Sequence, residues 1–438
     1  SSEIRLIFTI SRSEIVKMRR ISKCNLVRSD EKCIKNRFNP SGMYKRYMLS
    51  LFALAMLTFA CEQTPGLFKK QERKQPLNPY LEAFIQDYEQ FFEAEMERTK
   101  LPGAALAIVW DGSVVFMKGY GVKSLGERDS VDVHTVFRIG SLSKGFAGVL
   151  TSVLAEEGAF SLEDPVVRYV PEFMLRSEDQ ARRVKLRHLL SHSAGLPYHA
   201  FTNLIESGYD IPGIISRLRE VKLNGREGEV FSYQNAAFAV IEEVVRARTG
   251  RSYADLLEER IFQPVGMRDA SSSYEDIVMT KNKAFPHEGF DSTWAKTVFT
   301  HKFYNAVAAG GVNASISDMS KWLILLMGGQ PELVSPAVLD SVFYPRIKTN
   351  NERRFFRDWL GEKEAFYGYG WRILHTPEDT IIYHGGFVNS FKGELALQRK
   401  DRIGICVLMN GAGSMSSTVI PGFFERYRVY ADSIRISR

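Results

Sequence analysis

The 438-residue chain has 58 Lys and Arg residues against 51 Asp and Glu residues, a net charge of +7 that by itself suggests a nucleic-acid or membrane-surface partner. The excess is local, because residues 1–60 hold 12 basic and 4 acidic residues and leave 46 against 47 in the rest. A near-neutral body has no basic face for a phosphate backbone, so we expect no nucleic-acid partner.

The first sixty residues have the pattern of a targeting sequence. Met43-Tyr44-Lys45-Arg46 supplies a start and a positive n-region, and Met48 to Ala60 is an uncharged apolar run too short to cross a bilayer as a helix. We therefore interpret residues 43–60 as a signal peptide. Residues 1–42 precede this better start, and we interpret them as an upstream extension outside the native protein.

The apolar run ends at Ala60-Cys61, which resembles the bacterial lipoprotein cleavage box. We expect a lipid anchor on Cys61, a polar tether over residues 61–79 and a place in the bacterial cell envelope, facing the periplasm or the exterior. An ordinary signal peptide is the alternative. A lipidated Cys61 cannot pair with Cys406, so we expect no disulfide, and the apolar run around Cys406 predicts a buried structural thiol.

The globular part is expected to open with a helix and a hairpin. Apolar residues at helical spacing predict an amphipathic helix over Pro79 to Lys100 that covers a sheet. The apolar runs Ala104 to Trp110 and Ser113 to Tyr120 are joined by Asp111-Gly112, a strong signal for a two-residue hairpin. These runs predict an antiparallel pair.

The most informative motif of the chain is Ser141-Leu142-Ser143-Lys144. Residues three apart share one face of a helix, so the amine can reach the hydroxyl and make it a nucleophile. The apolar residues that follow keep the helical period, so Ser141 should open a buried helix whose free N–H groups favour negative charge on or beside its oxygen. The spacing alone is weak evidence, because Ser29-Asp30-Glu31-Lys32 repeats it in the upstream extension.

The later elements divide the body into two lobes. Helical patterns dominate from about residue 158 to 364, and they include Ala236 to Thr249, Tyr253 to Phe262 and Ile316 to Met327. Strands are expected at Gly370 to Leu374, Ile381 to His384, Gly393 to Gln398 and Ile403 to Met409. We therefore expect one domain over residues 80–438, with a sheet lobe (about 80–157 and 365–438) against a mostly helical lobe (about 158–364).

Three motifs in fixed order resemble the serine β-lactamase and penicillin-binding protein superfamily, most closely its class C β-lactamase, DD-peptidase and family VIII esterase branch. They are Ser141-Leu142-Ser143-Lys144, Tyr233-Gln234-Asn235 and His384-Gly385-Gly386, and the resemblance spans about Leu101 to Asn410. It implies a β-lactamase/transpeptidase-like fold of mixed α and β structure, in which helices cover an antiparallel sheet and a mostly helical lobe lies beside it.

The resemblance also implies the catalytic roles. Ser141 is the nucleophile, and Lys144 and Tyr233 share the removal of its proton, although the sequence leaves open which of them is the general base. Asn235 is expected to position the substrate through its amide. Taken singly, Tyr233 also fits a core aromatic residue and Asn235 a helix N-cap.

The third motif is expected to bind the substrate. The resemblance implies an oxyanion hole made by the backbone N–H groups of Ser141 and Phe387, with Gly385 and Gly386 letting a carbonyl approach; a plain turn is the alternative. Many β-lactamases have Lys-Thr-Gly where this chain has His384-Gly385-Gly386. Histidine is largely neutral at pH 7 and Gly385 has no hydroxyl, so carboxylate recognition should be weaker, which favours esterase or D-amino-acid peptidase activity.

Other catalytic arrangements fit the sequence less well. No Gly-x-Ser-x-Gly motif occurs. His188 and His192 have the i, i+4 spacing of a zinc-binding helix, but Leu189 stands where glutamate is needed, and Gly195 and Pro197 end the helix. We interpret both histidines as packing or loop-fixing residues and expect neither a metal nor an organic cofactor.

The sequence thus predicts a serine hydrolase that forms an acyl-enzyme at Ser141. Its partner would be a small molecule or peptide with an ester, amide or β-lactam carbonyl, and an esterase or peptidase is the favoured form. The alternative is a non-catalytic penicillin-recognising or cell-wall-binding lipoprotein. The intact set of Ser141, Lys144 and Tyr233 argues against that alternative.

Overall fold

In the computed structural model, residues 77–349, 356, 359, 364–377 and 379–437 are described. The upstream extension, the signal peptide, Cys61 and nearly all of the tether lie outside these residues and stay predictions. Among the described helices, none combines the length and the apolar character that crossing a membrane requires.

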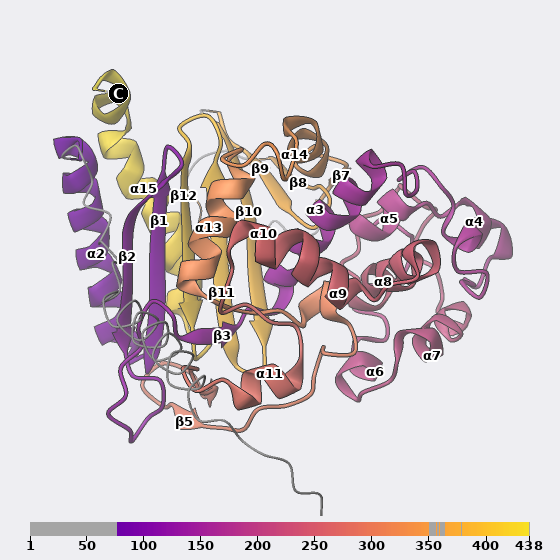
Figure 1. Cartoon of the computed structure of the whole chain (residues 1–438), viewed down its shortest axis with the longest axis horizontal. Helices are drawn as coiled ribbons and strands as arrows, with labels where there is room; N and C mark the ends of the chain where they lie inside the picture. The colour runs from indigo at the N-terminus through magenta and orange to yellow at the C-terminus, as the bar shows by residue number, and fades with distance from the viewer. Residues whose placement is uncertain (1–76, 350–355, 357–358, 360–363, 378, 438) are drawn as a thin grey trace, which may run out of the picture. The chain divides into compact units, whose positions relative to one another are not determined.

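An antiparallel sheet forms the centre of the described chain, with eight strands in the order β2-β1-β12-β11-β10-β9-β8-β7 (Figure 1). The strands are β1 (Gly103–Trp110), β2 (Ser113–Gly121), β7 (Ile347–Lys348), β8 (Glu364–Tyr367), β9 (Arg372–His375), β10 (Thr380–Val388), β11 (Phe391–Gln398) and β12 (Ile403–Met409). β1 pairs with β12, so the two ends of the sequence meet in one sheet, as the sequence predicts.

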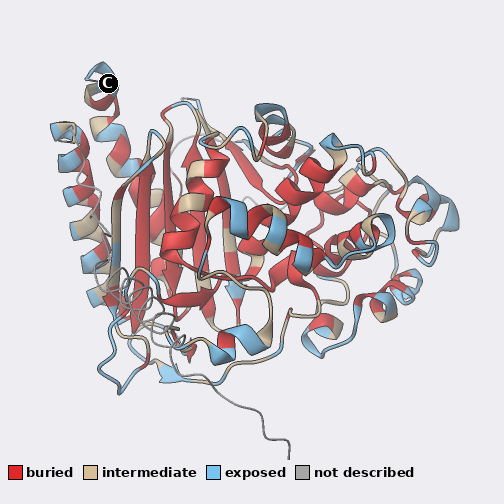
Figure 2. Ribbon diagram, viewed as in Figure 1, coloured by how far each residue is buried: buried red, intermediate tan, exposed pale blue. Residues whose placement is uncertain are grey.

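Both faces of this sheet are covered, which explains why β1 and β12 are apolar throughout. In β1, Ala105 and Ala107 belong to one hydrophobic cluster, whereas Leu106 and Ile108 belong to the other. Successive side chains of a strand point to opposite faces, so each cluster lies on one face. Figure 2 shows the central strands as buried. Cys406 in β12 is buried and unpaired, which confirms the structural thiol.

Two long helices, α2 (Pro79–Thr99) and α15 (Met415–Ile436), cover one face of the sheet (Figure 1). Phe84 packs against Phe423 with ring centroids 5.2 Å apart, and the Tyr88 hydroxyl donates to the Val419 carbonyl at 2.9 Å. The sequence predicts α2 but not α15. Pro421 lies inside α15, and proline normally ends a helix, which obscures the helical pattern there.

The other face carries the buried helix α3 (Ser143–Glu156) and α13 (Ile316–Leu326). The rings of Phe146 and Trp322 stack at 4.1 Å and join these helices. α13 contacts β1 and β12, although the sequence analysis assigns its residues to the helical lobe. The boundary differs because the apolar stripe of α13 matches the sheet face as well as it would match other helices.

The remaining described elements form the helical lobe and its connections to the sheet. They are β3 (Val136–Arg138), η2 (Gly140–Leu142), η3 (Val166–Arg168), α4 (Glu178–Arg183), α5 (Leu186–Leu190), α6 (Thr202–Glu206), α7 (Ile211–Ile215), η4 (Leu218–Glu220), α8 (Asn235–Thr249), α9 (Tyr253–Leu257), η5 (Glu258–Phe262), α10 (Gln263–Val265), α11 (Tyr274–Met279), β4 (His287–Glu288), β5 (Ala295–Lys296), α12 (Val307–Gly310), β6 (Asn313–Ser315) and α14 (Pro336–Val342). The predicted helix Tyr253 to Phe262 is α9 followed by the wider turn η5.

The short turn η2, which precedes α3 and contains Ser141, lies directly against β10. A Cβ atom on Gly386 would lie 2.0 Å from the Ile139 carbonyl oxygen, and one on Gly140 would lie 2.7 Å from the Phe387 nitrogen. Gly140 also has a φ of 53°, which glycine adopts without strain. The two glycines therefore let the backbones of η2 and β10 touch.

Replacing Gly386 by Ala should force η2 away from β10. We expect the free energy of unfolding to fall by about 2 kcal/mol or more, because the neighbour is backbone and cannot swing aside. Urea denaturation of the purified 77–438 region measures this fall.

The control is Gly158→Ala, since no atom lies within 4 Å of the added Cβ there. Its φ of 79° should limit the loss to about 1 kcal/mol from backbone strain. A Gly386→Ala protein as stable as the wild type would contradict the proposed contact.

Candidate active site

Ser141 and Lys144 lie together where η2 runs into α3, as the motif spacing predicts. The Lys144 ammonium nitrogen Nζ is 3.2 Å from Ser141 Oγ. Ser141 is partly exposed, whereas Lys144 is fully buried. The hydroxyl is therefore reachable from solvent and the amine beneath it is not.

Two further acceptors hold the Lys144 amine. Nζ donates to Asn235 Oδ1 at 2.7 Å and to the Ala309 carbonyl at 2.6 Å. Both oxygens can only accept, so each must receive a hydrogen from the amine. An ammonium donates its third hydrogen to Ser141 Oγ, whereas a neutral amine has only two hydrogens and turns its lone pair toward that oxygen.

The surroundings favour that neutral form. Burial lowers the pKa of Lys144 well below its ordinary value, and the Arg372 cation lowers it further. A deprotonated lysine near neutral pH can accept a proton, so Lys144 meets the chemical requirement for a general base.

Tyr233 lies next to this pair, as predicted. Its ring centroid is 4.8 Å from Lys144 Nζ and 5.2 Å from the Arg372 guanidinium carbon. The ring is 5% exposed and packs in a small cluster with Phe231 and Tyr367. Tyr233 is thus a buried aromatic residue and a neighbour of the amine at once.

Asn235 is the first residue of α8, and its side-chain oxygen accepts a hydrogen bond from Lys144. The N-cap position is Gln234, so the N-cap interpretation of Asn235 is not needed. Asn235 Nδ2 lies 3.2 Å from Thr202 Oγ1 and 3.4 Å from His199 Nδ1. Its role in binding substrate stays a prediction, while its contact with the Lys144 amine is observed in the structure.

His384 is fully buried and has internal partners at both ring nitrogens. Nδ1 lies 2.8 Å from the Gly385 carbonyl, an acceptor, so Nδ1 carries the hydrogen. Nε2 then accepts from the Tyr367 hydroxyl at 2.9 Å, with Arg372 Nη1 at 3.4 Å. Burial, helped by Arg372 and Lys144, lowers the pKa of His384 well below its ordinary value. The ring is neutral, as expected, and its substrate-binding role stays a prediction.

Arg372 is the cation that the sequence analysis missed. It is 5% exposed and lies beside Lys144, Tyr233 and His384. The sequence held one signal for Arg372, its place in the apolar stretch Trp371-Arg372-Ile373-Leu374. A buried arginine is rare without a functional or pairing reason.

Gly385 and Gly386 pack closely against protein atoms on the side where a Cβ would lie. A Cβ on Gly385 would meet the Tyr383 hydroxyl at 2.7 Å and Glu394 Oε2 at 2.9 Å, while Gly386 faces η2. The expected approach of a substrate carbonyl at these glycines and the oxyanion hole stay predictions. The Phe387 nitrogen lies close to Gly140 of η2, and the Phe387 side chain is exposed.

Comparison with known proteins identifies the family to which the chain belongs. A family model described as Beta-lactamase matches residues 88–422 of the chain. The chain belongs to the beta-lactamase family. The unguisins hydrolase ungD' of Aspergillus campestris is 24% identical to this beta-lactamase family chain over 324 residues, 71% of this chain and 59% of that protein.

Two further proteins are similar to this beta-lactamase family member. Protein flp of Staphylococcus aureus (strain N315) is 24% identical over 352 residues, 78% of this chain and 65% of that protein. The chain thus covers less than two thirds of the length of flp and of ungD'. The octameric penicillin-binding protein homologue from Pyrococcus abyssi matches with a TM-score of 0.69 and 25% identity, over 79% of this chain and 76% of that chain. The predicted fold class is confirmed.

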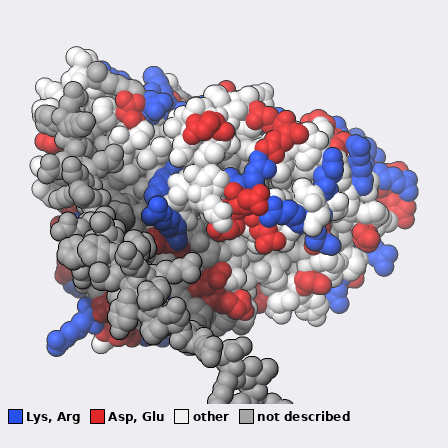
Figure 3. Space-filling model, in the orientation of Figure 1, with Lys and Arg blue, Asp and Glu red and all other residues white. Residues whose placement is uncertain are grey.

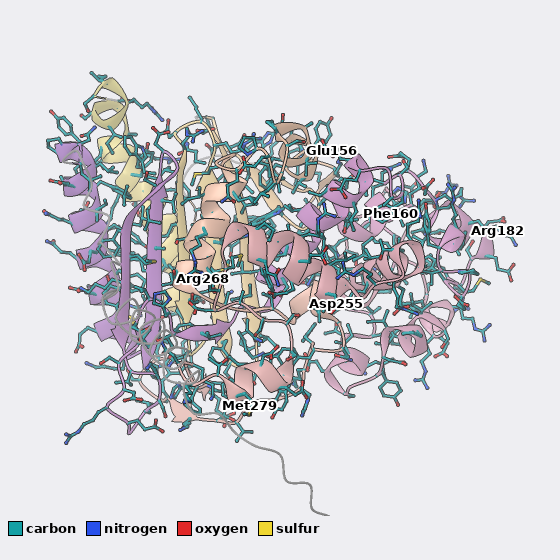
Figure 4. All side chains as sticks on the ribbon, in the orientation of Figure 1. Glu156, Phe160, Arg182, Asp255, Arg268 and Met279 are labelled. Carbon is teal, nitrogen blue, oxygen red and sulfur yellow. The ribbon has the colours of Figure 1, made fainter. Side chains whose placement is uncertain are left out.

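Several surface hollows of this beta-lactamase family chain lie apart from the motif residues. A hollow of about 860 Å³ is lined by Asp255 and Arg268, which are labelled in Figure 4. A second, of about 590 Å³, is lined by Arg182, and a third, of about 380 Å³, by Glu156. None of these three includes Ser141. On the face drawn in Figure 3, basic and acidic side chains are interspersed over the helical lobe, in line with a near-neutral body.

The pH dependence of the reaction at Ser141 should follow Lys144. We expect kcat/KM for an ester to rise with pH along a limb whose midpoint lies well below the ordinary lysine pKa, because only the neutral amine accepts the proton. In Arg372→Gln a positive charge near Lys144 is lost, so the pKa of Lys144 rises and the midpoint moves to higher pH. A pH profile of both proteins measures the shift.

The matched control is Arg399→Gln, a partly exposed arginine paired with Asp340. Its profile should coincide with that of the wild type. A midpoint that stays in place or moves to lower pH in Arg372→Gln would show that Arg372 does not set the basicity of the amine.

Proposed function

We propose that this chain is a serine hydrolase that forms an acyl-enzyme at Ser141. One observation carries the proposal: the buried Lys144 amine is held by two pure acceptors, and its remaining contact is Ser141 Oγ at 3.2 Å. A structural lysine would gain little from burial without a carboxylate, because desolvation of a cation is costly.

The reaction follows from these positions. Lys144 Nζ accepts the Ser141 proton as Oγ attacks the carbonyl carbon of the substrate, and the carbonyl electron pair moves to the oxygen. The backbone N–H groups of Ser141 and Phe387 stabilise that oxyanion. The ammonium then gives its proton to the departing oxygen or nitrogen, which leaves an acyl-serine. Water repeats the sequence with the acyl group as substrate, and Tyr233 shares the proton transfer.

Among carbonyl substrates, we propose short esters and D-amino-acid peptides ahead of β-lactams. Both nitrogens of His384 are occupied by protein groups, and Gly385 offers no hydroxyl. The name of the relative ungD' describes a hydrolase, which favours turnover over binding. We also propose that the protein acts in the bacterial cell envelope through a lipid on Cys61, on the sequence pattern alone.

Labelling tests the proposed nucleophile. A fluorophosphonate should modify the wild type, and Ser141→Ala should lower both labelling and hydrolysis of p-nitrophenyl butyrate at least about a thousandfold, since the attacking oxygen is gone. Ser152→Ala is the matched control, because Ser152 lies on the same helix and its Oγ bonds only the Gly148 carbonyl among the described residues.

Two outcomes would overturn the proposal. Equal labelling of wild type and Ser141→Ala would mean that another group reacts. Labelling by a tagged penicillin without turnover of p-nitrophenyl butyrate, nitrocefin or a D-alanyl peptide would favour the alternative, a non-catalytic penicillin-recognising lipoprotein.

A further inference from the structure

His192 lies in the connection that follows α5, and its backbone is in a conformation that few residues adopt. Its φ is 55°, in the left-handed region, and it is 2% exposed. α5 ends at Leu190, so His188 and His192 do not share a helical face and the zinc-helix spacing has no structural counterpart. A strained and buried histidine requires another reason to be there.

Two hydrogen bonds join His192 to the segment that carries Tyr233. The Ser232 N–H donates to the His192 carbonyl at 2.9 Å, and the Gln234 N–H donates to His192 Nδ1 at 3.1 Å. These two amides flank Tyr233 on either side. The Tyr233 carbonyl in turn accepts from the His199 N–H at 2.8 Å.

The His192 ring also packs against the Tyr233 ring. Their centroids are 4.2 Å apart, and the same imidazole packs against Tyr367 at 4.8 Å and Phe238 at 5.1 Å. Lys144 Nζ approaches the Tyr233 ring at 4.8 Å. The carbonyl and the imidazole of His192 therefore hold the backbone on both sides of Tyr233, and the imidazole limits where the Tyr233 ring can move.

The ring of His192 is held in one protonation state. Nδ1 accepts from a backbone N–H, so the hydrogen sits on Nε2, which has no hydrogen-bond partner among the described residues. Burial lowers the pKa of His192 well below its ordinary value, and the facing groups Lys144, His384 and Arg372 lower it further. Nδ1 remains an acceptor throughout the working pH range.

We propose that His192 is a positioning residue for Tyr233: its Nδ1 and carbonyl hold the two amides that flank Tyr233 and so keep the phenol beside Lys144. This role rests on the proposed acyl transfer at Ser141. It goes beyond packing, because packing needs only a ring of this size and the proposal needs an acceptor at one atom.

Two substitutions separate these requirements. His192→Phe keeps a ring and loses the acceptor. His192→Asn loses the ring but places Oδ1 three bonds from Cα, as Nδ1 is, and asparagine tolerates a positive φ better than most residues. A merely structural role predicts that Phe is the better replacement, and the positioning role predicts that Asn is.

The experiment measures kcat and KM for p-nitrophenyl butyrate, normalised to the sites that a fluorophosphonate titrates. We expect His192→Phe to lower kcat about 10- to 100-fold with little change in KM, since a displacement of about 1 Å costs up to about a hundredfold in rate. His192→Asn should recover at least about tenfold of that loss. The double variant His192→Phe/Tyr233→Phe should be no slower than Tyr233→Phe, because His192 acts through Tyr233.

The possible failures point to different causes. An active wild type with unchanged kcat per titrated site in His192→Phe, or losses that multiply in the double variant, would overturn this inference alone. A wild type that neither reacts with the fluorophosphonate nor hydrolyses any substrate would overturn the proposed function. If His192→Phe does not fold, His192→Leu makes the same comparison with His192→Asn, and amide hydrogen exchange of residues 231–235 should be faster in the apolar variant only.

Discussion

The structure of the site depends on one constraint, the burial of a lysine amine without a neutralising carboxylate among the described residues. Lys144 meets two carbonyl-type oxygens and one hydroxyl, so the surrounding groups satisfy its hydrogens but do not compensate its charge. The free energy that favours losing a proton here is the same free energy that would give Ser141 a base in the proposed reaction. Arg372 strengthens this tendency by repulsion, and neutral His384 adds no countercharge.

Three helices of the fold bring together the groups that surround the Lys144 amine. α3 carries Lys144, α8 brings Asn235, and α12 brings the Ala309 carbonyl, while β10 closes against η2. These segments are far apart in the sequence, and the hydrophobic cluster shared by α3, α8 and the sheet holds them together. A rigid core of this kind keeps a buried polar contact at fixed distance.

Much of this was accessible from sequence, because local patterns and short motifs carry it. The helix over Pro79–Thr99, the hairpin at Asp111 and Gly112, the strand Ile403–Met409 and the pair of Ser141 and Lys144 follow from periodicity and spacing. Features that depend on non-local packing did not follow: α15 with its internal proline, α13 on the sheet, Arg372, and the close packing of Gly385 and Gly386. Periodicity shows that a helix has an apolar face but does not show what covers it.

The backbone contact between Gly140 and Phe387 has a consequence for how such a scaffold can diversify. Between the turn that contains Ser141 and β10, main-chain atoms meet main-chain atoms with no side chain between them at this point. Substitutions in the loops around Ser141 can therefore change the surface beside it while this backbone contact stays as it is. Related proteins that share this turn can therefore differ in substrate through changes in the surrounding residues alone.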